Sequence, residues 1–466
     1  MRNEYPRADF VRQEWLSLNG EWSFSFEDGS AHKIQVPYVY QCEKSGINDQ
    51  RASRIVTYQR EFTLSSEWQG KNIILHFGAV DYRCKVYVNG DYVGGHVGGN
   101  TPFQLNITDY VHWKCEEISV IIEDFPTDET IARGKQFWQE KPEFIWYTDS
   151  TGIWQSVWIE PQPQACFDWI HFTPDVDKGQ VQISYRLKDS TPLPCSAQWK
   201  ISLQEKTYFS GELLCREQED SFTATVFGNH VLSGSFHFDG LCWSPDSPTL
   251  FDVTAQLLVD GQVTDTVKSY FGMRKITAEN GMIHLNNHPY YQKLLLDQGY
   301  WKESLLTAPD DEAFKQDILR AKAMGFNGCR KHEKVEDPRF LYWADKLGFL
   351  VWEGMASFIS YTPSAAAQFM REWQDVIQRD YNHPSIIVWG MLNESWGVPQ
   401  IYHDTIQQHF SRSLYHLAHS LDSTRLVISN DGWEMTETDV CAIHSYSHGT
   451  SDDHRQQQVF AECVKT

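Results

Sequence analysis

The chain has 466 residues, of which 62 are acidic and 40 basic, so its formal net charge is −22. This length provides for about two to four domains, and the hydrophobic content of 41% excludes global disorder. So negative a charge argues against nucleic acid or an anionic membrane surface as the main partner, because both need clustered Lys and Arg.

The N-terminus and the cysteines favour a reduced protein of the cytoplasm. Residues 1–10 contain no apolar segment of the kind that secretory signals carry, and no run approaches the roughly 18 apolar residues of a membrane span. The two closest of the ten cysteines, Cys195 and Cys215, are 20 residues apart, so no Cys-x-x-Cys metal or redox unit exists. We expect a cytoplasmic location, with no cofactor, no metal ligands and no membrane association.

Roughly the first 275 residues are predicted to be β-structure, because short β-branched and aromatic runs alternate with turn signals. Asn89-Gly90 and Asp260-Gly261 each lie between alternating runs and predict hairpins. A break near Pro161 divides this half. It separates residues 1–163 from residues 164–275, a piece of the size of an immunoglobulin-like sandwich.

Residues 276–466 have the alternating pattern of parallel β/α units. One helix is predicted to begin at Asp337-Pro338 and to end at Gly348. Apolar side chains at helical spacing predict two more helices, around residues 369–377 and 410–417. Six strand-like runs alternate with the helices, at residues 291–297, 325–332, 349–355, 386–394, 426–431 and 441–446.

Six strands do not close an eight-stranded barrel. Residues 276–466 number 466 − 276 + 1 = 191, whereas a (β/α)8 barrel takes about 250. The alternative, an open doubly wound sheet, would carry a Gly-rich first turn, which the segment after Leu296 lacks. We predict an incomplete barrel, about two β/α units short, and keep the open sheet as the alternative.

Polar side chains stand at the end of nearly every predicted strand. In a parallel barrel these ends carry the reactive groups, and a buried strand has no structural reason to finish in a carboxylate. The strand-end residues are Asp297, Arg330, His332, Trp352, Glu353, Asn393, Glu394, Asp431, His444 and Tyr446.

The most specific segment runs from Asn382-His383-Pro384 through an apolar strand into Asn393-Glu394-Ser395-Trp396. It resembles glycoside hydrolase family 2, the β-galactosidase and β-glucuronidase family. Segments along the whole chain share the resemblance; they are residues 15–24, 75–82, 86–90, 98–103, 151–160, 271–275, 325–332 and 441–446. The implied fold class is multidomain β plus α/β: a jelly-roll β-sandwich, an immunoglobulin-like β-sandwich and an incomplete (β/α)8 TIM barrel over residues 1–163, 164–275 and 276–466.

The resemblance also implies roles for the strand-end residues. Glu394 would be the general acid/base, because a glycosidic oxygen leaves poorly unless it is protonated. Asn393 would hydrogen-bond the sugar 2-hydroxyl, a contact that strengthens in an oxocarbenium-like transition state. The further substrate-binding candidates are Arg330, which would brace the nucleophile, Tyr446, which would contact it, and His332, Asp297, Trp352, Glu353 and His444.

The sequence departs from the family at the second carboxylate. A retaining glycosidase needs a nucleophile about 5 Å from the acid/base, and the family takes it from a Glu ending the seventh strand. The predicted strands stop at six, and the remaining acids, Asp452, Asp453 and Glu462, follow no strand. We therefore expect that the nucleophile is missing, that the chain is truncated before the last two barrel strands and that this polypeptide alone does not turn over glycosides.

The expected function is that of a retaining β-glycosidase, most simply a β-galactosidase. The alternative, a β-glucuronidase, would need positive charge for the sugar carboxylate, and the region that usually supplies it lies past residue 466. An alternative of another class is a carbohydrate-binding protein without catalysis. The expected partner is a β-glycoside, not nucleic acid or membrane, and a homo-oligomer is left open.

Overall fold

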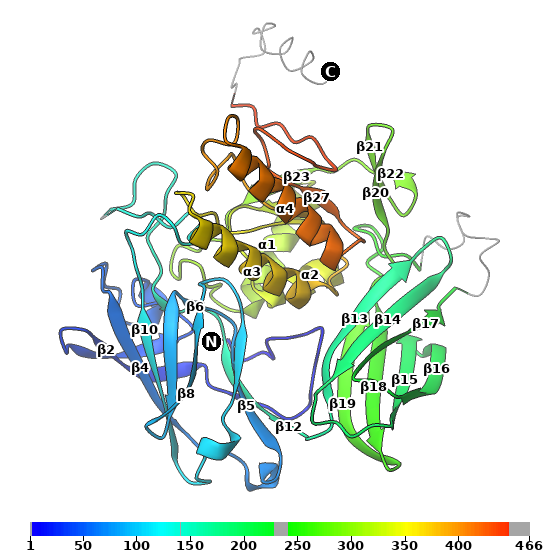
Figure 1. Ribbon diagram of the computed structural model, residues 1–466, viewed down its shortest axis with the longest axis horizontal. Coiled ribbons are helices and arrows are strands. Elements are labelled where there is room, and N and C mark those ends of the chain that lie inside the picture. The colour runs from blue at the N-terminus through cyan, green and yellow to red at the C-terminus, as the bar shows by residue number, and fades with distance from the viewer. Residues whose placement is uncertain (1, 140, 228–240, 447–466) are drawn as a thin grey trace, which may run out of the picture.

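The computed structural model describes residues 2–139, 141–227 and 241–446. Two antiparallel β-sandwiches are followed by a parallel β/α part that lies above both of them in Figure 1. The predicted fold class is thereby confirmed. The nine cysteines in these ranges form no disulfide, and seven of them are buried. No helix in the described residues is long and apolar enough to cross a membrane.

The first sandwich packs a six-stranded sheet against a four-stranded one. Its strands are β1 (Leu16–Ser17), β2 (Gly20–Phe26), β3 (Ala31–Val36), β4 (Ile55–Phe62), β5 (Asn72–Phe77), β6 (Val80–Asp81), β7 (Arg83–Val88), β8 (Asp91–Val97), β9 (Phe103–Asn106), β10 (Glu116–Glu123), β11 (Gly152–Ile153) and β12 (Val157–Gln162), with 3-10 turns at η1 (Glu43–Ser45), η2 (Ser66–Trp68) and η3 (Thr108–Tyr110). The sheet orders are β3-β2-β4-β10-β7-β8 and β1-β12-β5-β9, while β6 and β11 pair separately. Trp22 and Tyr58 are fully buried in the core between the sheets.

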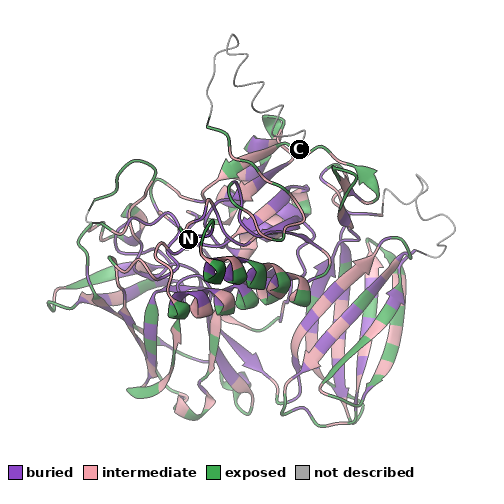
Figure 2. Cartoon of the chain, turned by 45° about the horizontal axis from the view of Figure 1, so that its top comes forward, coloured by how far each residue is buried: buried purple, intermediate pink, exposed green. Residues whose placement is uncertain are grey.

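The second sandwich has seven described strands, β13 (Phe167–Asp175), β14 (Gln180–Leu187), β15 (Cys195–Leu203), β16 (Lys206–Cys215), β17 (Glu219–Thr225), β18 (Phe251–Val259) and β19 (Gln262–Phe271). Their sheet orders are β13-β14-β17 and β16-β15-β18-β19, with Trp199 buried between the sheets. Figure 2 shows buried and exposed bands alternating along these strands, as two facing sheets require.

Both predicted hairpins are confirmed. Asn89-Gly90 joins β7 to β8, and Asp260-Gly261 joins β18 to β19. All four residues have positive φ, between 49° and 88°. These values match the twist that a two-residue hairpin turn imposes on its strands.

Residues 10–12 contact the second sandwich. Val11 pairs with Lys268 of β19, and Phe10 packs in the second core. Nε and Nη2 of Arg12 donate to the two carboxylate oxygens of the buried Asp265, at 3.0 and 2.9 Å. The segment therefore ties the predicted domain of residues 1–163 to its neighbour through a bidentate ion pair.

The third part begins with a small sheet of β20 (Ile276–Glu279), β21 (Met282–Leu285) and β22 (His288–Pro289). A five-stranded parallel sheet and four helices follow, namely β23 (Leu294–Asp297), α1 (Asp311–Ala323), β24 (Gly328–Lys331), α2 (Pro338–Leu347), β25 (Leu350–Gly354), α3 (Pro363–Asp380), β26 (Ile386–Gly390), α4 (Thr405–Leu421) and β27 (Leu426–Ile428). As predicted, α2 has Asp337 as its N-cap and Gly348, at φ 69°, as its C-cap.

The order of the parallel strands decides between the two predicted architectures. The strands neighbour one another in chain order, β23-β24-β25-β26-β27, without the reversal that a doubly wound sheet requires. Val351, Trp389 and Val427 pack with the helices, whereas Leu350 and Val388 belong to a separate cluster. The helices thus cover one face and the other faces inward, which is the arrangement of a barrel arc.

The predicted sixth strand is wrong. Residues 441–446 make a single bridge, between Ile443 and Gly432, and form no strand. Ile443 is 46% exposed and Tyr446 66% exposed. A parallel strand is normally covered on both faces, whereas four of these six residues are exposed. Five strands therefore stand where six were predicted.

Arg274 connects the second sandwich to the parallel sheet. Its buried guanidinium donates to the carbonyl oxygens of Pro384, Thr424 and Ile386, at 3.2, 2.6 and 3.1 Å. These carbonyls belong to the segments that enter β26 and β27. Each unpaired buried carbonyl costs about 1–3 kcal/mol.

We therefore expect Arg274→Met to lower the free energy of unfolding by about 3 kcal/mol or more, measured by urea unfolding monitored by circular dichroism. Arg216→Met, at an exposed position, is the control and should change it by less than about 0.5 kcal/mol. Equal stability of the two variants would contradict the bridging role of Arg274.

Candidate functional site

The Asn393-Glu394 pair lies in a turn directly after β26. Glu394 and Ser395 have φ values of 46° and 59°, a left-handed conformation that side chains rarely adopt. The neighbouring strand end holds the turn, because the amide of Glu394 donates to the carbonyl of Asp431 at 3.0 Å. The Glu394 side chain is thereby directed by a fixed, strained backbone.

Two side chains from residues 441–446 hold the Glu394 carboxylate. Nδ1 of His444 lies 2.6 Å from Oε1 of Glu394, and the Tyr446 hydroxyl donates to the same oxygen. Nε2 of His444 lies 3.3 Å from Oδ1 of Asp431. The hydrogen bond to Asp431 is the main cause that raises the pKa of His444, and its protonated ring can donate to both carboxylates.

Arg330 organises the opposite side of the site. Its guanidinium pairs with Asp431 and donates to Oδ1 of Asn393 at 2.6 Å. Nδ2 of Asn393 in turn donates to Oε1 of Glu333 at 3.1 Å. Burial raises the pKa of Glu333, which favours its neutral form.

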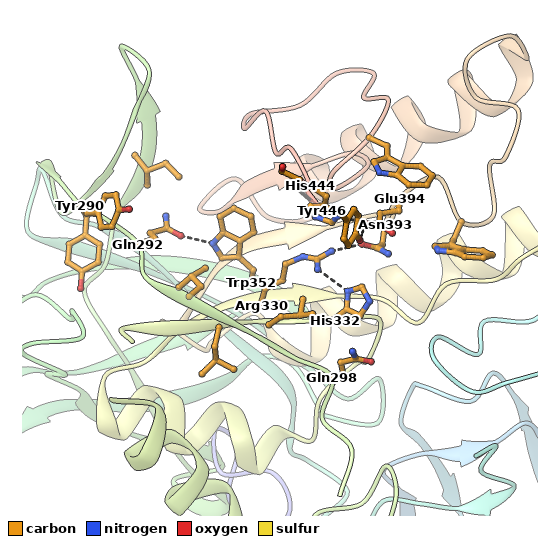
Figure 3. Close-up of a pocket in the computed structure, with 18 of the residues that line it drawn as sticks. Tyr290, Gln292, Gln298, Arg330, His332, Trp352, Asn393, Glu394, His444 and Tyr446 are labelled. Atoms are coloured by element: carbon orange, nitrogen blue, oxygen red, sulfur yellow. Dashed lines mark hydrogen bonds and ion pairs between the residues drawn. The ribbon is translucent and has the colours of Figure 1, made fainter. Parts of the chain in front are cut away.

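His332 contacts the same guanidinium, with its Nδ1 2.9 Å from Nη1 of Arg330 (Figure 3). Burial and the charge of Arg330 lower the pKa of His332 to about 3. The ring is therefore neutral near pH 7. With Nδ1 accepting from Arg330, its Nε2–H remains as a donor.

All of these residues except Glu333, Ser395 and Asp431 line a pocket of about 1070 Å³. Aromatic rings form much of its wall, among them Trp352, Trp396, Trp433 and Tyr446. The indole of Trp352 donates to Gln292 at 2.7 Å, as Figure 3 shows. Among the lining residues that the structure describes, Glu394 is the one carboxylate. Rings beside a few convergent polar groups are typical of a small-ligand site.

The structure brings most of the predicted site residues together in this pocket. Arg330, His332, Trp352, Asn393, Glu394, His444 and Tyr446 line it. Two of them have partners within the described residues, and the contacts with the nucleophile that the resemblance implies for them stay predictions. Arg330 pairs with Asp431, and Tyr446 donates to Glu394.

Asp297 and Glu353 are not brought to the pocket. Successive side chains of a strand point to opposite faces, so Trp352 faces inward and Glu353 points toward the helices, fully buried. Asp297 likewise pairs with Lys331 on the outer face of β24. A strand end alone does not say which face a residue occupies, and neither residue lines this pocket. Their roles in substrate binding stay predictions.

Three residues near Glu394 were given no role in the predicted site. Asp431 was named as a strand-end residue, because it ends the predicted strand 426–431, but no function was assigned to it. Glu333 follows His332 in an irregular loop with a φ of 53°. Lys135 comes from the loop between β10 and β11 of the first sandwich, and no local pattern links it to the barrel. In the described residues, no group of His, Cys, Asp or Glu could hold a metal ion.

Three family models match the sequence. "Glycosyl hydrolases family 2, sugar binding domain" matches residues 32–162, and "Glycosyl hydrolases family 2" matches residues 166–274. "Glycosyl hydrolases family 2, TIM barrel domain" matches residues 306–465. Together the matches cover both sandwiches and the β/α part.

The curated relatives include enzymes of two named activities. A β-galactosidase of Thermoanaerobacter pseudethanolicus is 24% identical over 429 residues, covering 88% of this chain and 54% of that protein. A putative β-glucuronidase of Formosa agariphila is 23% identical over 440 residues, covering 89% of this chain and 50% of that protein. The chain spans about half the length of the curated relatives it matches.

Solved structures share the fold. The β-D-glucuronidase of Dictyoglomus thermophilum matches with a TM-score of 0.80 at 20% identity, covering 99% of this chain and 82% of that one. The β-galacturonidase of Eisenbergiella tayi matches with a TM-score of 0.72 at 22% identity, covering 92% and 72%. The similarity thus extends over both sandwiches and the barrel arc.

The buried position of Glu353 predicts a pH effect on stability. Burial and the neighbouring charge of Asp380 raise the pKa of Glu353 to about 8, above the roughly 4.3 of an unfolded Glu. A carboxyl whose pKa is raised on folding adds stability below the unfolded pKa, and that stability is lost as the pH rises through the folded pKa. The unfolding free energy should therefore fall between pH 6 and 9.

In Glu353→Gln, the loss of unfolding free energy between pH 6 and 9 should be smaller by about 1–2 kcal/mol. Urea unfolding at the two pH values measures this loss. The control Glu27→Gln, at an exposed position, should keep the wild-type slope. An unchanged slope in Glu353→Gln would show that another group titrates.

Proposed function

The chain belongs to glycosyl hydrolase family 2, and from this premise we propose that it acts on β-glycosides by the retaining mechanism, with Glu394 as the general acid/base. The observation that carries the proposal is the position of Glu394. It is the one carboxylate among the described pocket-lining residues, and His444 and Tyr446 hold it on a strained turn. Pre-organised carboxyl groups of this kind are used to protonate a leaving oxygen.

In the proposed reaction Glu394 donates its proton to the glycosidic oxygen as the bond to the sugar C1 breaks. It later takes a proton from the water that attacks the glycosyl-enzyme. Asn393 is fixed by Arg330 and Glu333. This leaves its second amide hydrogen for the sugar 2-hydroxyl. The neutral His332 offers a further donor.

We propose that the nucleophile is not among the described residues. Two further carboxylates lie near Glu394, Asp431 and Glu333. They are 3% and 4% exposed, and neither lines the pocket. Asp431 is also neutralised by Arg330. An attacking carboxylate must reach the sugar C1 itself, so Asp431 acts as a positioning residue. Asp452, Asp453 and Glu462 lie outside the described residues.

For the glycone, the sugar that the enzyme would release, we keep galactose as the first choice, as expected from the sequence. Glucuronic acid is the alternative. Relatives named β-galactosidase and β-glucuronidase match over similar shares of the chain. The aromatic wall of the pocket suits the apolar face of either sugar. Cell fractionation would test the predicted cytoplasmic location. Light scattering would show whether the protein forms a homo-oligomer.

The 466-residue chain should not hydrolyse aryl β-glycosides in buffer alone. Added azide should restore cleavage, because it replaces the nucleophile. Azide attacks C1 from the face opposite the aglycone, the C1–O bond breaks, and Glu394 gives its proton to the leaving oxygen. The product is an α-glycosyl azide, which NMR identifies. Glu394→Gln should lower this rate about 10²- to 10³-fold for a phenyl glycoside, and far less for a dinitrophenyl glycoside, whose leaving oxygen needs no proton.

The control Glu437→Gln, on an exposed side chain, should leave the azide-supported rate unchanged. Turnover at ordinary enzyme rates without azide would contradict the missing nucleophile. Glycoside binding without cleavage, even with azide, would contradict the enzyme proposal and favour the non-catalytic carbohydrate-binding alternative.

A further inference from the structure

The loop between β10 and β11 carries part of the first sandwich to the barrel pocket. The amides of Arg133 and Gly134 both donate to the carbonyl of Ser357, each at 3.0 Å. Gly134 has a φ of 58°, and a Cβ there would lie 2.2 Å from the carbonyl oxygen of Glu333. Glycine therefore permits a backbone approach that no other residue would, and the next residue, Lys135, enters the pocket.

Aromatic contacts fix the Lys135 ammonium beside the catalytic turn. Its Nζ lies 4.4 Å from the ring centroid of Trp146, within the range of a cation–π contact. Trp146 meets the ring of Trp396 edge to face, with centroids 5.2 Å apart. Because Trp396 follows Glu394 by two residues, the position of the ammonium is coupled to that of the acid/base.

Lys135 has no counter-ion among the residues that the structure describes. By contrast, Arg330 pairs with Asp431, and Lys331 and Lys334 pair with Glu336. Lys135 makes no ion pair within 4 Å in the described part of the chain, although it is 4% exposed and lines the pocket. A desolvated ammonium without a partner is costly.

The nearby carboxyl groups do not fill this role. Burial lowers the pKa of Lys135, while the charges of Glu333 and Glu394 oppose that shift from beyond ion-pair distance. Glu333 is committed to Asn393, and its own raised pKa favours the neutral form. Glu394 is held by His444 and Tyr446 and forms no ion pair with Lys135. A counter-ion must therefore come from the ligand.

We propose that Lys135 receives an anionic substituent of the bound sugar, a carboxylate or a sulfate ester, and so makes this pocket selective for acidic β-glycosides. The inference rests on the proposed function, because it assumes that a β-glycoside occupies the pocket. An anionic group provides both hydrogen-bond acceptors and the missing charge. The hydroxyl groups of a neutral sugar provide acceptors alone.

The test is calorimetry with three non-hydrolysable probes, phenyl 1-thio-β-D-glucuronide, phenyl 1-thio-β-D-galactoside and its 6-sulfate. We expect an acidic probe to bind at least about tenfold more tightly than the neutral galactoside. The acidic probe that binds more tightly identifies the source of the charge. Lys135→Met should remove the preference by lowering acidic affinity about tenfold or more, with neutral affinity changing less than about threefold.

Two matched variants distinguish the loss of the Lys135 charge from a general effect of substitution on folding. Lys135→Arg should keep the acidic preference, because the charge remains. Lys141→Met, at an exposed position of the same loop, should keep all wild-type affinities. Stronger binding of the neutral galactoside, or an acidic preference that persists in Lys135→Met, would overturn the inference while leaving the proposed function intact. Binding of none of the three probes would overturn both.

Discussion

The ion pair between Arg330 and Asp431 is the interaction on which the candidate site depends. Arg330 belongs to β24 and Asp431 follows β27, with two strands between them. In a flat sheet, strands three positions apart are about 14 Å from one another, so the pair forms because the sheet curls toward its inner face. The same contact gives Asn393 and His444 their fixed partners. The site can therefore assemble only when the sheet is curved.

Features that depend on local chemistry could be predicted from the sequence. Asn89-Gly90 requires positive φ for steric reasons alone, and Asp337-Pro338 begins a helix through its own side chain and ring. The Asn393-Glu394 pair could be recognised because an apolar strand leads directly into it. In each case the deciding atoms lie within a few residues of one another.

Features that depend on the rest of the fold could not be predicted. Residues 441–446 have the composition of a strand, but a strand also needs neighbours that cover it. Glu353 and Trp352 are adjacent in sequence, yet the pleat sends one outward and the other inward. Lys135 lies 259 positions before Glu394 in the numbering, and only the docking of the loop between β10 and β11 brings them together.

The electrostatics of the pocket oppose those of the chain. A net charge of −22 repels acidic ligands at long range, but salt screens that repulsion beyond about 8 Å in physiological solution. Around the pocket, Asp431 neutralises Arg330 and burial favours the neutral form of Glu333, while the ammonium of Lys135 has no counter-ion among the described residues. Desolvated charges interact more strongly than screened surface charges. In the proposed selectivity for acidic sugars, Lys135 therefore acts at short range, where the acidic surface of the chain is screened.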